Sequence, residues 1–252
     1  MIRRVREELA KIETREEVRV LYACESGSRA WGFASTDSDF DVRFIYVHRR
    51  DWYLSIEDRR DVIEVPIDDE LDISGWDLRK ALALLRKSNP PLLEWLKSPI
   101  IYHQDPVFTE EFQALAAECF SPARCFAHYL HMAAGNWRAY LRERSMVKLK
   151  KYLYVFRPVL GCRWIERRTG QVPMLFQELV DAVLEDGEVK DALQALVARK
   201  MAGVELDEEP PVAVLSDFLE SELVRLEALN HPEPSPHGTE ELNRFLRRWI
   251  AP

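Results

Sequence analysis

Long apolar runs are missing from the 252-residue sequence. No stretch approaches the ~20 consecutive apolar residues that a membrane-spanning helix needs. Three of the first six residues are arginine, and no apolar signal segment follows them. Because nothing in the sequence predicts insertion into a membrane or export, we expect a cytoplasmic protein without a membrane partner.

Cysteine is also scarce, and its spacing is uninformative. No C-x-x-C pair and no zinc-finger spacing occurs among the four cysteines, Cys24, Cys119, Cys125 and Cys162. A disulfide framework and a structural zinc site are therefore not indicated. We expect four reduced, buried thiols.

An excess of positive charge is absent, since the formal net charge is −8. This argues against a protein that coats nucleic acid by bulk electrostatics. The charge is uneven, however. Residues 142–168 contain nine Lys or Arg and two Glu, so a polyanionic partner should bind near this segment.

The order of apolar patterns predicts two domains of different class. An amphipathic helix should end near Thr14, and β-favouring runs follow at 18–23, 40–46, 62–67 and 71–73. Ser74 and Asp77 are expected to cap the next helix. Beyond residue 105 the patterns are helical. We expect an α/β domain over 1–105, with a mixed sheet and flanking helices, and an all-helical domain over 106–252.

The strand at 40–46 carries the first sign of chemistry. Asp39, Asp41 and Arg43 alternate with apolar residues in period two, so their side chains should share one face of the strand. Carboxylates are the ligands that Mg²⁺ prefers, and two of them can position the ion against a triphosphate. We predict that Asp39 and Asp41 bind Mg²⁺, for which Mn²⁺ could substitute. Arg43 either contacts phosphate or balances the carboxylate charges.

Upstream, an apolar strand runs directly into Gly27 and Ser28. A glycine lets backbone N–H groups approach an anion, and the serine hydroxyl adds a donor, so this pair is a candidate phosphate-binding loop. Two alternatives fail on the sequence. An EF-hand loop that begins at Asp37 needs glycine at Val42, and a Walker loop needs lysine directly after Gly27.

A third carboxylate commonly completes such a site, as a metal ligand or as the base for the attacking hydroxyl. Asp72 is the candidate, because it lies between two apolar residues of the next expected strand. We expect that strand to be antiparallel to the one carrying Asp41. Glu64 is the second choice, and Asp77 is assigned to helix capping.

A basic helix is expected over 146–168, with Leu149, Leu153, Phe156 and Leu160 on its buried stripe. One edge carries Lys148, Lys151 and Tyr152, and the other carries Lys150, Tyr154 and Arg157. One hypothesis is that an edge binds the nucleotide, with lysines near the phosphates and a tyrosine stacked on the base. We select Lys148, Lys151 and Tyr152. The alternative is a solvated edge whose tyrosines only cover the core.

These motifs resemble those of the RNA-repair-associated polymerase-beta-type nucleotidyltransferases. The resemblance is carried by residues 25–33 (ESGSRAWGF), 38–46 (SDFDVRFIY), 71–80 (LDISGWDLRK), Asn89 with Glu94-Trp-Leu96, and 148–158. It implies a nucleotidyltransferase fold with a helical carboxyl-terminal partner, Mg²⁺ dependence, and action on RNA ends.

The combined prediction is an enzyme that binds a nucleoside triphosphate between its two domains. It would transfer the nucleoside monophosphate to an acceptor hydroxyl, an RNA 3′ end, and release pyrophosphate. A protein side chain or a small hydroxylated molecule is an alternative acceptor. A nucleotide-binding regulatory module without catalysis is an alternative of another class, although retention of repelling carboxylates argues against it.

Overall fold

The computed structural model describes residues 1–65, 70–167, 170–203, 206, 208–229 and 238–251. These residues form two compact units. The sheet unit comprises Met1–Ala30, Asp39–Phe120 and Ser235–Pro252, and the helical unit comprises Trp31–Ser38 and Ser121–Pro234. Within the described residues, every helix is too short or too polar to span a bilayer.

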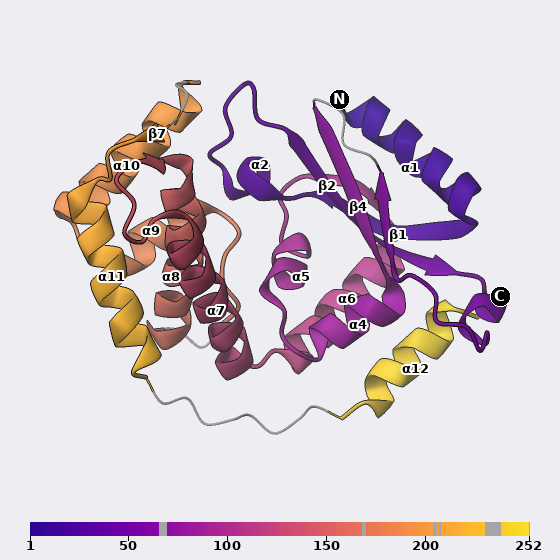
Figure 1. Cartoon of the computed structure of the whole chain (residues 1–252). Coiled ribbons are helices and arrows are strands. Elements are labelled where there is room, and N and C mark those ends of the chain that lie inside the picture. Colours follow the sequence, from indigo (N-terminus) through magenta and orange to yellow (C-terminus); the bar gives the residue numbers. More distant parts are fainter. Residues whose placement is uncertain (66–69, 168–169, 204–205, 207, 230–237, 252) are drawn as a thin grey trace. The chain divides into compact units, whose positions relative to one another are not determined.

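The sheet unit is built on a five-stranded mixed sheet (Figure 1). Its strands are β1 (Val18–Glu25), β2 (Phe40–His48), β3 (Val62–Val65), β4 (Leu71–Asp77) and β5 (Ile101–Gln104). They lie in the order β3-β4-β2-β1-β5. The β2–β4 pair is parallel, and the other three pairs are antiparallel.

The direction of β4 corrects the sequence-based expectation of an antiparallel neighbour. β3 and β4 are antiparallel to each other, and it is β4, the second of the two, that pairs with β2. β3 therefore runs antiparallel to β2, and β4 runs parallel to β2. β4 also continues through Ser74 to Asp77, so Ser74 is a strand residue and does not cap a helix, whereas Asp77 does. The sequence did not predict β5.

Helices cover both faces of the sheet. The sheet unit contains α1 (Ile2–Glu16), α2 (Gly27–Trp31, whose last residue is in the helical unit), α3 (Arg50–Tyr53), α4 (Leu78–Leu85), α5 (Pro90–Trp95), α6 (Pro106–Cys119) and α12 (Glu240–Trp249). The apolar stripe of α1 packs with Val42, Phe44 and Tyr46 in one core cluster. Asp41 and Arg43 consequently lie on the opposite face of β2.

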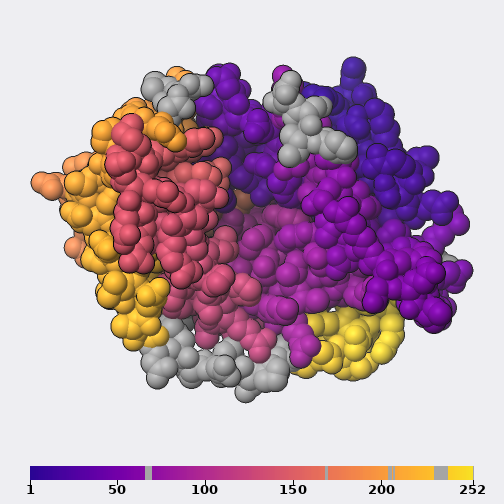
Figure 2. Space-filling view, in the orientation of Figure 1, coloured from indigo at the N-terminus to yellow at the C-terminus, as the bar shows by residue number. Residues whose placement is uncertain are grey.

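The carboxyl-terminal helix α12 belongs to the sheet unit. Phe245 and Trp249 pack against Phe108 of α6, with ring centroids 5.9 and 5.0 Å apart. In Figure 2, the yellow surface of α12 lies against the magenta part of the sheet unit. Since α6 also contacts β1, the compact units divide at residues 120 and 121, and not at 105 and 106 as the sequence suggested.

The helical unit contains five helices among its described residues: α7 (Pro122–Tyr140), α8 (Lys150–Arg167), α9 (Phe176–Val183), α10 (Glu188–Met201) and α11 (Ala213–Glu227). A two-stranded sheet of β6 (Val147–Lys148) and β7 (Glu208–Glu209) is the small departure from an all-helical unit. α8 contacts α7, α9 and α11, which explains why residues on most of its circumference are buried.

Candidate active site

The end of β1 brings the glycine-serine pair against the strand that carries Asp41. The Ser26 N–H donates to the Asp41 carbonyl oxygen at 2.8 Å, and Gly27 then adopts φ +59° at the start of α2. A Cβ atom on Gly27 would lie 2.1 Å from Asp41 Oδ2. Only glycine allows this backbone to lie so close to the carboxylate, so the structure joins the two motifs into one site.

Asp41 and Asp72 form the carboxylate pair of this site. They are direct partners in the parallel β2–β4 register, so both side chains leave the same face of the sheet from neighbouring strands. Their side chains are 32% and 30% exposed. Burial raises the pKa of Asp41; the Arg43 guanidinium opposes this rise, and the charges of Asp72 and Asp39 add to it.

Arg43 lies between these two carboxylates. Its Nη2 donates to Asp41 Oδ1 at 3.1 Å and to Asp72 Oδ2 at 2.8 Å. Its Nη1 donates to the carbonyl oxygens of Val42 at 3.0 Å and Asp72 at 3.3 Å. These contacts match the charge-balancing role, one of the two that the sequence left open.

Asp39 lies one residue before β2 and is exposed. Its carbonyl oxygen accepts from Arg29 Nε at 3.2 Å, and the Arg29 guanidinium lies 3.7 Å from the centroid of the Phe40 ring. Across the described residues, no three His, Cys, Asp or Glu side chains are arranged to hold a metal ion. Arg43 occupies the position between Asp41 and Asp72 that a shared cation would take.

Glu25 is a site residue that the sequence analysis missed. It is fully buried at the end of β1, and its Oε1 accepts from the Asp41 backbone N–H at 2.7 Å. Tyr102 of β5 donates its hydroxyl to Glu25 Oε2. Burial raises the pKa of Glu25, and these two hydrogen bonds oppose the rise. Glu25 thus fixes the backbone that carries Asp41, and an acidic residue directly before the glycine loop was the available signal.

The other acidic candidates lie outside the pair. Glu64 is on β3, opposite Ser74, and is exposed and ion-paired with Arg60. Asp77 caps α4, as expected, by accepting from the Arg79 backbone N–H at 2.8 Å. Asp72 is therefore the third carboxylate that the geometry favours.

The basic helix begins later and is more deeply buried than the sequence suggested. Lys148 is exposed but lies in β6, paired with Glu208, and α8 starts at Lys150. Tyr152 is fully buried, and its hydroxyl contacts Ser216 Oγ at 2.5 Å and accepts from the Val212 N–H at 3.1 Å. Tyr152 cannot stack on a nucleotide base without unpacking the core, so that assignment is wrong.

The exposed tyrosine of this helix is Tyr154, which is 40% exposed. Lys151 Nζ lies 3.9 Å from the centroid of the Tyr140 ring and 5.4 Å from that of Tyr154. Trp31 meets Tyr154 edge to face at 5.9 Å. Lys151 is thereby held between two aromatic rings on the surface of the helical unit.

A cationic pocket lies at the carboxyl-terminal end of α7. It has a volume of about 540 Å³ and is lined by Arg138, Arg142, Glu143 and Arg144. Arg142 Nε donates to Glu143 Oε1 at 3.1 Å, so one carboxylate partly balances three guanidinium groups. Glu143 has φ +55°, a left-handed conformation that is uncommon outside glycine.

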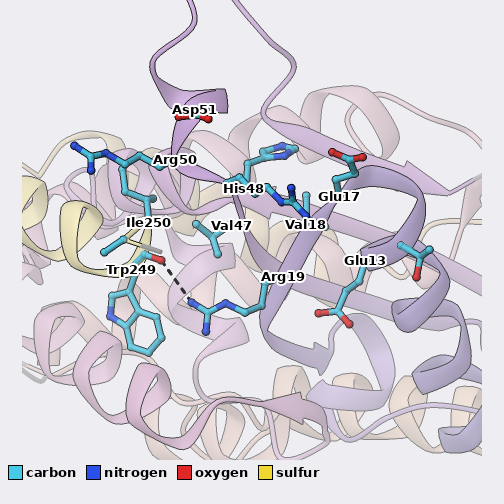
Figure 3. Close-up of a pocket in the computed structure, with 13 residues that line it drawn as sticks. Glu13, Glu17, Val18, Arg19, Val47, His48, Arg50, Asp51, Trp249 and Ile250 are labelled. Carbon is cyan, nitrogen blue, oxygen red and sulfur yellow. Dashed lines mark hydrogen bonds between the residues drawn. The ribbon is translucent and has the colours of Figure 1, made fainter.

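Another pocket, of about 990 Å³, lies at the far end of β2 from Asp41. Figure 3 shows Arg19, His48 and Trp249 around it, with Arg19 donating to the Trp249 carbonyl oxygen at 3.5 Å. Burial lowers the pKa of His48 to about 4. His48 is seven residues from Asp41 along the strand, a distance of about 23 Å. This pocket is therefore separate from the carboxylate pair.

The family comparison agrees with the motifs. The family model described as "RlaP: RNA repair pathway DNA polymerase beta family" matches residues 1–248. "Uncharacterized protein YcgL" of Bacillus subtilis (strain 168) is 48% identical over 252 residues, which cover 99% of this chain and 96% of that protein. The crystal structure of a nucleotidyltransferase-like protein from Exiguobacterium sibiricum 255-15 is 11% identical, with a TM-score of 0.34, over 90% of this chain and 73% of that one.

Proposed function

Because the chain belongs to the RlaP family, the RNA repair pathway DNA polymerase beta family, we propose that it transfers a nucleoside monophosphate from a nucleoside triphosphate to an acceptor hydroxyl. The observation that carries this proposal is the close approach of Gly27 to Asp41, which is itself paired with Asp72. This contact places the candidate phosphate-binding loop beside the carboxylate pair, an arrangement that suits phosphoryl transfer.

Asp41 and Asp72, with Asp39 at the entrance to β2, would hold Mg²⁺ or Mn²⁺. Their carboxylate oxygens are the ligands that such hard cations take, and the close pair on adjacent strands has charge to neutralise. When bound, the cation would neutralise phosphate oxygens and orient the reacting groups.

The chain's own residues would perform the remaining steps. Gly27 and Ser28 donate to the outer phosphates, and Asp72 accepts the proton of the acceptor hydroxyl. The new bond joins that oxygen to the α-phosphorus, and the bond from the α-phosphorus to the bridging oxygen breaks. Pyrophosphate leaves with the bonding electron pair.

The acceptor we propose is an RNA 3′ end. The family description refers to RNA repair, and the helical unit carries surface features that suit a single strand. The pocket lined by Arg138, Arg142 and Arg144 suits phosphates, and exposed Tyr154 offers a ring on which a base can stack. The net charge of −8 favours the alternative acceptor, a protein or small-molecule hydroxyl.

The test is to incubate the full chain with each α-labelled nucleoside triphosphate, Mg²⁺, and a pool of RNA, DNA and protein acceptors. We expect label in RNA, and we expect none with the Asp41→Asn variant. Label in protein or small molecules would select the alternative acceptor. Failure to label anything, with the triphosphate still bound, would identify a regulatory module.

A paired substitution tests the arginine pocket. Arg142→Glu with Arg144→Glu should weaken RNA binding about tenfold or more. It should also reduce the slope of log affinity against log salt concentration by roughly two, because two phosphate contacts are lost. Arg247→Glu with Arg248→Glu is the matched control, because it reverses the same number of exposed arginines on α12. Equal RNA affinity and salt slope in the two variants would remove the pocket from the RNA site.

A further inference from the structure

The Arg43 guanidinium is fixed beside the carboxylate pair by hydrogen bonds from two of its nitrogens. Nη2 bridges Asp41 Oδ1 and Asp72 Oδ2, while Nη1 is held by two backbone carbonyl oxygens. These four hydrogen bonds engage four of the five N–H donors that an arginine has. The side chain is only 19% exposed, so its position is set by the sheet and not by solvent.

A divalent cation and this guanidinium cannot share the carboxylate pair. Mg²⁺ binds carboxylate oxygens at about 2.1 Å, and the oxygens that face each other now accept from Arg43 at 3.1 and 2.8 Å. The other Asp41 oxygen, Oδ2, lies beside Gly27, 2.1 Å from the position that a Cβ on this residue would take. Positive charges placed a few ångströms apart there would also repel strongly.

A triphosphate would give the displaced guanidinium another partner. Phosphate oxygens accept paired hydrogen bonds from arginine as carboxylates do. Gly27, where the outer phosphates are expected, lies against the same Asp41 carboxylate that Arg43 contacts. Binding of the cation and binding of the triphosphate therefore both depend on the position of the Arg43 guanidinium.

We infer that Arg43 is an internal counterion that couples the two ligands: it excludes a divalent cation from Asp41 and Asp72 until a nucleoside triphosphate draws it away. The inference rests on the proposed function, since it takes the carboxylate pair to be the cation site. It makes Arg43 a positioning residue whose effect appears in metal binding before any turnover.

The experiment measures Mn²⁺ binding to the full chain by electron paramagnetic resonance, without nucleotide and with α,β-methylene-ATP. Without nucleotide, Arg43→Met should bind Mn²⁺ about tenfold or more tightly than the parent, a typical size for coupling between two ligands. The analogue should then tighten binding in the parent much more than in the variant. Arg60→Met is the matched control, because it removes an arginine ion-paired with a carboxylate on β3.

Two further variants keep the test decisive. Arg43→Gln keeps a neutral side chain with hydrogen-bond donors and replaces Arg43→Met if that variant does not fold. Adding Asp72→Asn should abolish the gained affinity and so locate the ion. Equal Mn²⁺ affinity in parent and Arg43 variants would overturn the counterion role and leave the proposed function standing. If no protein binds Mn²⁺ even with the analogue, the metal-dependent function fails and the counterion role with it.

Discussion

Strand β4 carries two aspartates with opposite surroundings. Asp77, at one end, is fully buried; its Oδ1 accepts from the Arg79 N–H at 2.8 Å and its Oδ2 from the Tyr53 hydroxyl at 2.6 Å. Asp72, at the other end, is 30% exposed, and its Oδ2 accepts from Arg43 Nη2 at 2.8 Å. The odd spacing of five residues places the two on opposite faces.

This difference distinguishes a structural carboxylate from one available for chemistry. A backbone N–H and a packed tyrosine cannot leave Asp77 without local unfolding, so its oxygens are permanently committed. In the inferred counterion role, Arg43 leaves Asp72 and Asp41 when a triphosphate binds, and their oxygens then become available to a cation. Asp72 and Asp77 have the same side chain, and their burial and their partners separate them.

The largest effect is expected when one aspartate of the carboxylate pair is replaced. Asp41→Asn should lower the rate of nucleotide transfer by about 10³-fold or more, equivalent to roughly 4 kcal/mol, because it removes charge at the cation site. Stability in urea should change by less than about 1 kcal/mol. Asp37→Asn is the control, since Asp37 is exposed two residues before Asp39. Equal rates for the two variants would rule out Asp41 as a cation ligand.

Gly27→Ala should give the next largest loss, about 10²-fold in transfer rate, with every carboxylate retained. The new Cβ would overlap Asp41 Oδ2 and displace it. Gly32→Ala is matched for backbone strain, because Gly32 has φ +86°, but its Cβ would meet only Leu175, at 3.3 Å. Both variants should lose about 1–2 kcal/mol in stability. If both lose the same activity, strain and not the carboxylate contact explains the effect.

Strand periodicity was sufficient to predict much of the site. Alternation along β2 placed Asp41 and Arg43 on one face, and two apolar neighbours placed Asp72 in a strand. The pairing of these strands was not predictable, because register and direction depend on contacts between segments distant in the chain. The parallel direction of β4 and the contact of Glu25 with Tyr102 of β5 are of this non-local kind.

Helix periodicity was less informative for α8. The helical wheel correctly placed Leu149, Leu153, Phe156 and Leu160 inside. It could not separate Tyr152 from Tyr154, because both flank the stripe. Their difference arises from α11, since Tyr152 contacts Ser216 of that helix, whereas Tyr154 remains exposed. Which flank of a helix is covered is decided by its neighbours and not by its own pattern.

At the buried end of β4, Asp77→Ala should reduce stability by about 2–4 kcal/mol. The change removes a helix cap, worth about 1 kcal/mol, and leaves the Tyr53 hydroxyl without its acceptor, which costs about 1–3 kcal/mol. Asn89→Ala removes a cap alone, the hydrogen bond from the Leu92 N–H, and should cost about 1 kcal/mol. Urea unfolding measures both. Equal losses would mean that the Tyr53 contact contributes nothing.

The smallest effect is the pH dependence of the Asp77 contribution. Burial raises the pKa of Asp77 above its ordinary value of 3.8, although the hydrogen bonds from Tyr53 and Arg79 oppose the rise. A carboxyl group whose pKa is higher in the folded state stabilises most when protonated, and this contribution is lost as pH rises through the folded-state pKa. The stability of the parent relative to Asp77→Asn, which does not titrate, should therefore decline as pH rises above the ordinary carboxyl pKa of 3.8, as measured by urea unfolding. A relative stability that instead increased with pH would show that the hydrogen bonds from Tyr53 and Arg79 stabilise the Asp77 carboxylate more than burial destabilises it.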